Sequence, residues 1–435
     1  MNIFESWGKY PKVQQEAQHL NWIFDKIKFD KNKTYLPFGL GRSYGDSCLN
    51  DKGIIIPTRR INRLINFDKQ AGILNCEAGI SLEEIINFSL PLGWFLPVTP
   101  GTKFVTVGGA IANDIHGKNH HLAGNFGNFV KSFVLLRSNG ERLECSKEKN
   151  IALFNATIGG LGLTGLILSV ELQLKSVSGP LIDLETIKFK GLEEFFEISK
   201  DSDKKYEYTV AWLDCVSTGN DFGRGIFMRG NHSIKKSDKY HPKKLPLNVP
   251  FNMPNWSLNR LSVSAFNFLY YNKQITKEKK SLVNYNPFFY PLDLVDNWNR
   301  IYGRNGLLQF QCVVPKEKNI DKITNILKMV VSSGKASFLA VFKEFGDIKS
   351  YGMLSFPRAG STLCLDFPNT AKTRKLLLEL DNLVLEAGGA SYPAKDALLP
   401  EHSFKTYYPL WDKFREYKDP LFNSSYWRRV TGETK

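Results

Sequence analysis

Glycine is concentrated in three short segments within the first 180 residues, at positions 39–45, 101–117 and 159–165. Such segments are poor helices and poor strands, because glycine loses more backbone freedom on folding than any other residue. Without a Cβ in the way, their backbone N–H groups can turn toward a phosphate. Taken alone, the segment 39–45 favours a tight turn between strands, and a phosphate cradle is the alternative.

The third segment contains Gly160–Gly165, which has the G-x-G-x-x-G spacing of Rossmann dinucleotide-binding folds. That fold requires a helix directly after the loop, because the helix N-terminus holds the pyrophosphate. Residues 166–174 instead alternate between apolar and polar side chains, which predicts a half-buried strand. The sequence therefore argues against a Rossmann fold.

Local patterns predict further elements along the chain. Period-2 runs predict strands, apolar residues at helical spacing predict helices, and a Ser-x-x-Glu capping box predicts a helix start. The predicted strands cover 54–57, 72–78 and 166–174, and the predicted helices begin at Ser81 and cover 319–331 and 372–386. Glycine becomes rarer after Pro180, which we interpret as a domain boundary.

Composition excludes several classes of protein. The 435 residues, 42% hydrophobic and 23% charged, are typical of a globular chain of two or three domains rather than of a disordered chain. Six scattered cysteines without a C-x-x-C pair predict free thiols in a reducing compartment. The N-terminus has no secretory signal pattern, which favours the cytoplasm, and the uncharged but glycine-containing stretch 151–170 predicts buried backbone rather than a membrane span.

Positive charge is concentrated in one segment. The chain has a net charge of +15, and residues 229–280 contain eleven basic and two acidic residues. Pro246, Pro250 and Pro254 alternate there with apolar residues, which predicts a mobile loop. The segment fits a solvated insertion, a lid that meets anionic lipid, or a nucleic-acid surface. We expect no nucleic-acid partner, because no nucleic-acid-binding motif accompanies the charge.

The second glycine-rich segment leads into three histidines, His116, His120 and His121. Zinc enzymes of the H-E-x-x-H type need two histidines on one helical face with a glutamate between them, and here no glutamate is present and the glycine density opposes a helix. We therefore expect no metal site. Small residues around Thr106 and Asn113 instead suggest backbone that lies against a large flat ligand.

These segments carry a resemblance to a known family. Gly39–Asp46, Pro100–Gly109 and Asp114–His121 resemble the FAD-binding domain of the vanillyl-alcohol-oxidase (PCMH-type) superfamily. From about residue 35 to the C-terminus, the chain resembles the decaprenylphosphoryl-β-D-ribose oxidase family within it. The longer resemblance rests on the motifs at 289–293, 308–311, 364–368 and 392–396.

The resemblance implies an α+β fold, with a PCMH-type FAD-binding domain of two subdomains and an inserted α+β substrate domain built on an antiparallel sheet. The FAD domain would comprise residues 1–180 and 391–435, and the substrate domain residues 181–390. Many superfamily members link FAD covalently through a histidine in Gly-x-Gly-His-Ser. Arg42 stands at that position here, so we expect noncovalent FAD.

The resemblance also implies a set of cofactor contacts. They are Gly39, Leu40, Gly41, Arg42, Ser43, Tyr44, Gly45, Gly101, Thr106, Val107, Gly108, Gly109, Asn113, Asp114, Ile115, His116, Gly162, Ile167 and Tyr392. The implied substrate contacts are Tyr44, His116, Gln309, Gln311, Lys343 and Cys364, and the implied catalytic residue is Lys395. Hydride transfer needs no thiol nucleophile, so Cys364 is given no catalytic role.

The implied reaction is oxidation of the 2′-hydroxyl of a polyprenyl-phosphoryl-β-D-ribose to the ketone, by hydride transfer to flavin N5. A separate NADH-dependent short-chain reductase would complete the epimerisation, and peripheral association with the inner membrane is expected. One alternative is a sugar-1,4-lactone or alditol oxidase of the same superfamily that uses O₂. Another is a non-enzymatic flavin-fold protein that binds through its basic segment.

Overall fold

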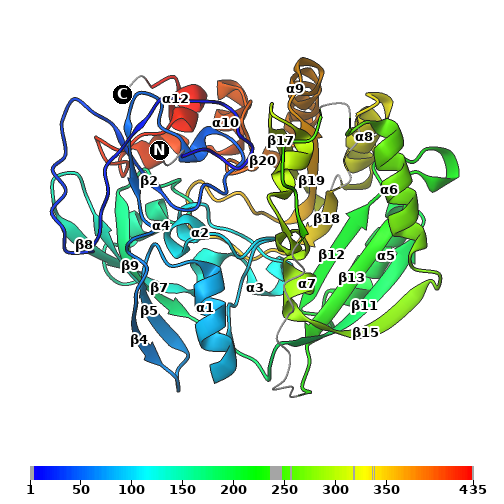
Figure 1. The fold of residues 1–435 in the computed structure, drawn as a ribbon, viewed down its shortest axis with the longest axis horizontal. Helices are drawn as coiled ribbons and strands as arrows, with labels where there is room; N and C mark the ends of the chain where they lie inside the picture. Colours follow the sequence, from blue (N-terminus) through cyan, green and yellow to red (C-terminus); the bar gives the residue numbers. More distant parts are fainter. Residues whose placement is uncertain are drawn as a thin grey trace.

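Three sheets organise the protein (Figure 1). The computed structural model describes residues 4–235, 247–254, 257–316, 319–335, 337 and 339–433. Within these residues an eight-stranded sheet occupies one side of the molecule, and a five-stranded and a three-stranded sheet occupy the other. Helices and predominantly antiparallel sheets together confirm the predicted α+β fold class.

The five-stranded sheet is antiparallel and has the order β4-β5-β9-β7-β8. Its strands are β4 (Leu64–Asp68), β5 (Ile73–Glu77), β7 (Val130–Leu136), β8 (Arg142–Ser146) and β9 (Leu166–Gln173). Helices α1 (Leu82–Ser89), α2 (Val107–Ala112), α3 (His120–Ala123) and α4 (Ile151–Thr157) belong to the same part of the chain. Their apolar residues share one core with those of the sheet.

The three-stranded sheet is parallel, with β3 (Ile54–Pro57) between β1 (Glu16–Ala17) and β2 (Tyr35–Phe38). The last part of the chain returns to this sheet, because Tyr35 forms a β-bridge with Phe422. The C-terminal helices are α10 (Glu401–Tyr407), α11 (Trp411–Arg415) and α12 (Ser425–Thr431). Figure 1 shows α10 and α12 near β2 and both chain ends.

The eight-stranded sheet is antiparallel throughout, in the order β15-β11-β13-β12-β18-β19-β17-β20. Its strands are β11 (Leu181–Phe189), β12 (Tyr208–Leu213), β13 (Gly225–His232), β15 (Glu278–Asn284), β17 (Leu307–Pro315), β18 (Ala340–Phe345), β19 (Gly360–Pro368) and β20 (Ala390–Ser391). The remaining short strands are β6 (Trp94–Phe95) with β10 (Lys175–Ser176), and β14 (Leu247–Asn248) with β16 (Val295–Asp296).

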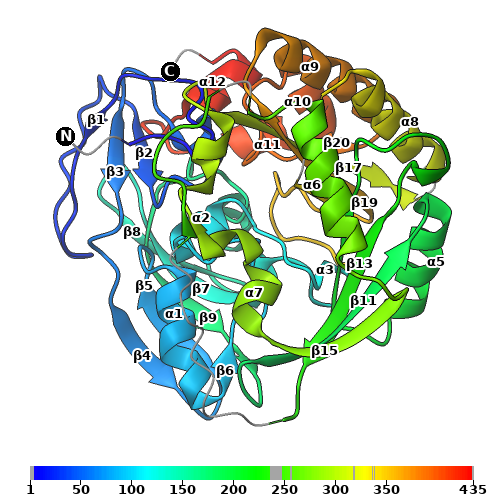
Figure 2. The ribbon, with the colours of Figure 1, turned by 45° about the vertical axis from the view of Figure 1, so that its right-hand side comes forward.

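Helices α5 (Leu192–Ser202), α8 (Asn319–Ser332) and α9 (Ala371–Glu386) cover one face of the large sheet (Figure 2). Alternate strand residues, such as Phe310, Phe342 and Leu363, enter the core beneath these helices. Because side chains alternate along a strand, the intervening residues project from the opposite face. Helices α6 (Arg260–Asn272) and α7 (Tyr285–Phe289) lie on that opposite side.

The predicted elements that have a simple period or a cap are confirmed. The predicted strands correspond to β3, β5 and β9, and the predicted helices to α1, α8 and α9. Ser81 caps α1 in a full capping box with Glu84. Strand β9 follows Gly160–Gly165 directly, as expected for a loop that is not a Rossmann motif.

Two predictions were wrong in part. The glycine density around residues 101–121 does not prevent a helix, because Thr106 caps α2 through Gly109 N–H and the buried Val107, Ala110 and Ile111 anchor it. The basic segment 229–280 is not all loop, because α6 occupies its second half, capped by Asn259. Positions 236–246 and 255–256, which include Pro246, lie outside the described residues.

None of the helices in the described ranges has the length and hydropathy that a membrane crossing requires. The stretch 151–170 instead forms α4, a glycine-containing loop and the start of β9, and most of its residues are buried. All six cysteines are free, as predicted.

Candidate active site

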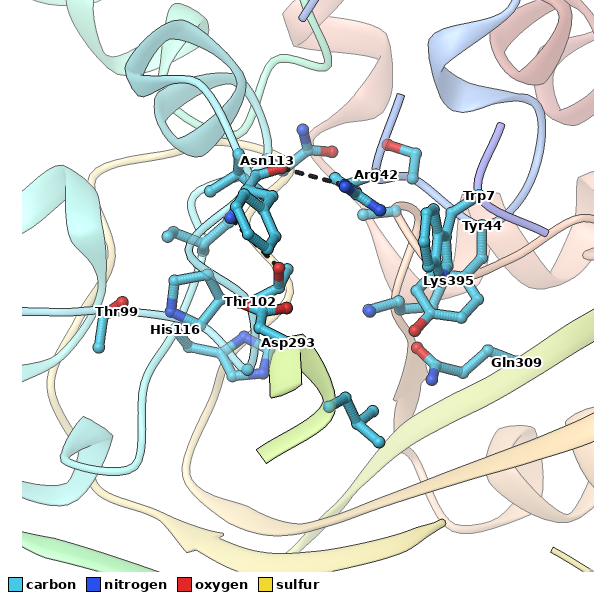
Figure 3. A pocket seen from close by; sticks show the side chains of 18 of the residues that line it. Trp7, Arg42, Tyr44, Thr99, Thr102, Asn113, His116, Asp293, Gln309 and Lys395 are labelled. Atoms are coloured by element: carbon cyan, nitrogen blue, oxygen red, sulfur yellow. Dashed lines mark hydrogen bonds between the residues drawn. The ribbon is translucent and has the colours of Figure 1, made fainter. Parts of the chain in front are cut away.

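A cavity of about 780 Å³ lies between the glycine-rich loops and the open face of the eight-stranded sheet. Its volume is within the range of small-molecule and cofactor sites. The loop after β2, the 99–118 region and the loop before β9 line one side, and β17, β18 and β19 line the other. Figure 3 shows residues from both sides that point into this space.

The glycine-rich side leaves room for a ligand that lies against the backbone. A Cβ on Gly39 would be 2.5 Å from Thr106 Oγ1, and Gly41 has a positive φ of 63°. Gly101 has no atom within 4 Å of a Cβ position, so the backbone there borders open space. Asn113 Oδ1 and His116 Nδ1 are buried and have no hydrogen-bond partner among the described residues. These features fit FAD, whose polar atoms could satisfy both groups.

The cavity brings most of the predicted cofactor residues together. Those that line it are Gly39, Leu40, Gly41, Arg42, Ser43, Tyr44, Gly101, Thr106, Gly108, Gly109, Asn113, Ile115, His116, Gly162, Ile167 and Tyr392. Arg42 Nε donates to Phe104 O at 3.1 Å, and its guanidinium lies 4.0 Å from the centroid of the Trp7 ring. The hydroxyl of Tyr392 donates to Asn113 O, which ties the C-terminal part of the site to α2.

Three predicted cofactor residues do not line the cavity, namely Gly45, Val107 and Asp114. A Cβ on Gly45 would be 1.7 Å from Asp396 O, so this glycine allows the chain to pack closely behind the site. Val107 is fully buried in the core. Asp114 is buried, accepts hydrogen bonds from Gly127 N at 2.9 Å and Ser355 Oγ at 2.6 Å, and therefore organises the loops around the site.

All predicted substrate and catalytic residues also line the cavity: Tyr44, His116, Gln309, Gln311, Lys343, Cys364 and Lys395. Figure 3 shows Lys395, Tyr44 and Gln309 together on one side, across from His116 and Thr99. The Lys395 ammonium lies 3.9 Å from the centroid of the Tyr44 ring. Burial lowers the pKa of Lys395, while Cys364 and Asp366 oppose this shift. Lys395 can therefore give up its proton more readily than an exposed lysine, and its neutral amine can accept one.

Asp366 lies on β19 beside this group and was not predicted, although its motif at 364–368 was recognised. Gln309 Nε2 donates a hydrogen bond to Asp366 Oδ1. Burial raises the pKa of Asp366 to about 7, against the hydrogen bond from Gln309 and the charge of Lys395. Its alternation with Cys364 on β19 could have indicated that both face the cavity.

Another part of the cavity lining contains Lys343, which is buried, and Lys118, which is half-buried. Lys343 Nζ donates to Gly117 O at 2.6 Å, and burial together with the charge of Lys118 lowers its pKa to about 7. Lys118 was also not predicted as a site residue; burial lowers its pKa to about 8. Its place in the recognised run 114–121 was the available signal.

His116 connects the two sides of the cavity, because its Nε2 lies 3.1 Å from Gln311 Nε2. Burial and the neighbouring charge of Lys343 hold the pKa of His116 well below its usual value, so the ring is neutral at pH 7. In the part of the chain that the structure describes, no group of three His, Cys, Asp or Glu side chains could hold a metal ion.

Comparison with known proteins shows which family the chain belongs to. Residues 28–146 match the family described as FAD binding domain. The chain is 38% identical over 410 residues to decaprenylphosphoryl-beta-D-ribose oxidase from Mycolicibacterium smegmatis, covering 90% of this chain and 88% of that protein. The chain belongs to the decaprenylphosphoryl-β-D-ribose oxidase family. It is an FAD-dependent oxidoreductase that acts on CH–OH groups.

Other relatives extend this picture of the decaprenylphosphoryl-β-D-ribose oxidase family. An uncharacterised protein from Streptomyces coelicolor is 31% identical over 372 residues, covering 81% of this chain and all of that protein. L-gulonolactone oxidase from Mus musculus is 33% identical over 178 residues, but the match covers only 39% of this chain and 40% of that enzyme. The similarity to the lactone oxidase is thus confined to a smaller part of the chain.

Proposed function

We propose that this protein oxidises the 2′-hydroxyl of a polyprenyl-phosphoryl-β-D-ribose to the 2′-ketone. The similarity to decaprenylphosphoryl-beta-D-ribose oxidase, which extends over both sides of the cavity, carries this proposal. The lysines in the cavity lining support it, because a phosphorylated sugar brings negative charge that buried cations attract.

When bound, FAD would supply the hydride acceptor for the oxidation of the alcohol at C2′. Lys395 would hold the 2′-hydroxyl and accept its proton, since burial lowers the pKa of its amine. Asp366 would favour the protonated form of Lys395 after this transfer, and Gln309 holds the Asp366 carboxyl in place. Arg42 and the loop 39–45 would hold FAD without a covalent bond.

The 2′-ketone must be reduced from the opposite face to give the arabinose epimer. This protein would release the ketone to a separate NADH-dependent reductase of the short-chain type, which returns a hydride to C2′. Oxidation to the ketone removes the stereocentre at C2′, so the inverted configuration forms only when a hydride returns to the face opposite the one it left.

We also propose peripheral association with an anionic membrane, through the outer side of α6. Leu261 is 82% exposed and Leu269 is 69% exposed, and Ile275, just after the helix, is 94% exposed. Arg260 and Lys273 flank this apolar surface at either end of the helix. Apolar side chains can enter the interface while basic side chains bind lipid phosphates. We expect no nucleic-acid partner.

The experiment that tests the activity is anaerobic addition of farnesylphosphoryl-β-D-ribose to the holoenzyme. Bleaching of the flavin absorbance, with a ketone recovered from the sugar, is the expected result. Bleaching by L-gulono-1,4-lactone or an alditol, and not by the phosphoryl ribose, would replace the proposal with a lactone or alditol oxidase. Retained flavin with no bleaching by any of these alcohols would contradict both.

A further inference from the structure

The open face of the eight-stranded sheet changes in polarity across its width. Gln311 on β17 pairs with Cys364 on β19, Cys364 with Val341 on β18, and Val341 with Trp212 on β12. All four residues line the cavity. Paired residues on neighbouring strands project to the same face, so this row forms one continuous floor that begins with an amide and ends with an aromatic ring.

The floor continues beyond Trp212 with apolar side chains. Val210 pairs with Met228 on β13, and Leu184 on β11 and Val283 on β15 line the cavity farther along the sheet. Every residue that β11, β12, β13, β15 and α6 contribute to the lining is apolar or aromatic. We call the part of the cavity lined by Leu184, Val210, Trp212, Met228, Phe266 and Val283 the apolar arm.

Helix α6 covers the apolar arm and brings it to the surface. The Tyr270 ring lies 4.8 Å from the Trp212 ring, which joins the helix to the floor. Phe266, one turn earlier, lines the cavity and is 42% exposed. Figure 2 shows α6 lying across the strands of this part of the sheet. The arm therefore leads from the polar residues near Lys395 to the helix whose outer side is apolar.

We propose that the apolar arm binds the first isoprene units of the substrate's hydrocarbon chain, which leaves the protein beneath α6. Without a ligand, the apolar arm exposes Met228, Val283 and Phe266 to water, which is unfavourable in free energy. A bound prenyl chain would cover these side chains and remove that exposure. The pyranose- or furanose-phosphate end would lie over Gln311 and Lys343, where the floor is polar. The assignment rests on the proposed function for the sugar end, but its lipid part can be tested separately.

The test measures binding of geranyl phosphate and farnesyl phosphate to the holoenzyme by isothermal titration calorimetry, below the micelle concentrations. The variant Met228→Gln/Val283→Thr keeps side-chain size but makes the arm polar. The matched control Met353→Gln/Val134→Thr carries the same changes at half-buried positions that do not line the cavity. Flavin absorbance shows that each variant retains its cofactor site.

Wild type and control are expected to bind farnesyl phosphate more tightly than geranyl phosphate, because the added isoprene unit becomes buried. We expect Met228→Gln/Val283→Thr to bind farnesyl phosphate about tenfold more weakly than the wild type does. In this variant the ratio of the affinities for farnesyl and geranyl phosphate should also be smaller than in wild type. Equal affinity of the wild type for the two phosphates would overturn the assignment. It would also be overturned if the longer chain improved affinity as much in the arm variant as in the wild type.

Turnover separates this inference from the proposed function. If arm variants lose affinity for farnesyl phosphate but the wild type oxidises no phosphoryl ribose, the lipid assignment stands and the proposed substrate is wrong. If the wild type oxidises farnesylphosphoryl-β-D-ribose and the arm variants bind and oxidise it equally well, the proposed function stands and the arm assignment is wrong.

Discussion

Lys343 is buried and Lys118 and Lys395 are half-buried in one cavity, and desolvation lowers the pKa of each. Their surroundings differ, since Asp366 lies near Lys395 whereas Lys343 contacts a backbone carbonyl and is repelled by Lys118. These environments assign different tasks to the three residues. Lys395, beside Asp366, is suited to exchange a proton, whereas Lys343 and Lys118 hold an anion in their protonated forms, which a bound phosphate would favour.

Replacing Lys395 by methionine is expected to lower kcat about 100-fold or more while FAD remains bound, because the proton acceptor is lost. In the wild type, kcat should rise with pH as Lys395 loses its proton, with a midpoint below the usual lysine value of 10.5. Stopped-flow measurement of flavin reduction across pH checks both effects. A Lys395→Arg variant that retains the wild-type rate would contradict the role as base, because arginine stays protonated.

The pKa of Lys343 predicts how stability depends on pH. Its folded pKa is about 7 against an ordinary value of 10.5, so the folded state binds fewer protons than the unfolded state between these values. The contribution of Lys343 to stability is therefore present above pH 10.5 and is lost as pH falls toward 7. We expect Lys343→Met to raise Tm most at pH 7 and progressively less toward pH 10.

Thermal unfolding of both holoproteins across that pH range tests this expectation. Lys372→Met, at an exposed lysine on α9, is the control and should leave the pH dependence unchanged. A constant difference in Tm between Lys343→Met and wild type at every pH would show that Lys343 does not titrate in this window.

The side chain at position 42 predicts whether FAD is bound covalently or noncovalently. Its guanidinium is engaged by Phe104 O and the Trp7 ring, and it offers no imidazole for a covalent link. Acid precipitation of the purified holoenzyme should therefore release FAD into the supernatant. Flavin fluorescence that stays with the denatured chain in a gel would contradict noncovalent binding.

At the scale of elements, α6 presents an apolar outer side between basic residues. We expect Leu261→Gln/Leu269→Gln to reduce cosedimentation with phosphatidylglycerol vesicles several-fold, because each exposed leucine contributes apolar area to the interface. The matched control, Leu378→Gln/Leu410→Gln, changes two exposed leucines on other elements and should bind like wild type. Equal loss of binding in both variants would contradict a role for α6.

Elements with a local signal could be predicted from the sequence, and those held by tertiary contacts could not. Helix α1 has its capping box and β9 its strict alternation. Helix α2 contains Gly108 and Gly109, whose low helix propensity is offset by the Thr106 cap and by burial. Helix α6 buries only Val263 and Asn267, so its sequence lacks a wide apolar stripe facing the core.

The residues of the candidate site also fall into those with a local sequence signal and those that only tertiary contacts identify. Glycine loops and motifs named most of its residues, yet only the strand register shows that Asp366 faces Gln309 across neighbouring strands. Lys118 escaped attention because the recognised run 114–121 does not show which of its side chains face the cavity. The packing of Phe288 and Phe289 from α7 beside Lys118 is what buries it.

At the scale of the whole molecule, the proposed division of the reaction between this protein and a reductase predicts an intermediate. Incubation of the enzyme with farnesylphosphoryl-β-D-ribose and an artificial electron acceptor should accumulate the 2′-ketone, even when NADH is present. Trapping of the ketone with borodeuteride, which places a deuterium on C2′ of the trapped product, followed by mass spectrometry, checks this. Direct formation of the arabinose epimer by the isolated protein would contradict the need for a reductase.

The alternation along β17, β18, β19 and β12 also bears on how this protein can change during evolution. On each strand one set of residues fills the core and the other set forms the cavity floor. Inserting or deleting one residue would exchange the two sets, sending Leu363 and Leu365 into the cavity and Asp366 into the core. Substrate preference can therefore drift by single substitutions on the floor, whereas insertions or deletions of an odd number of residues within these strands would disrupt both the core and the floor.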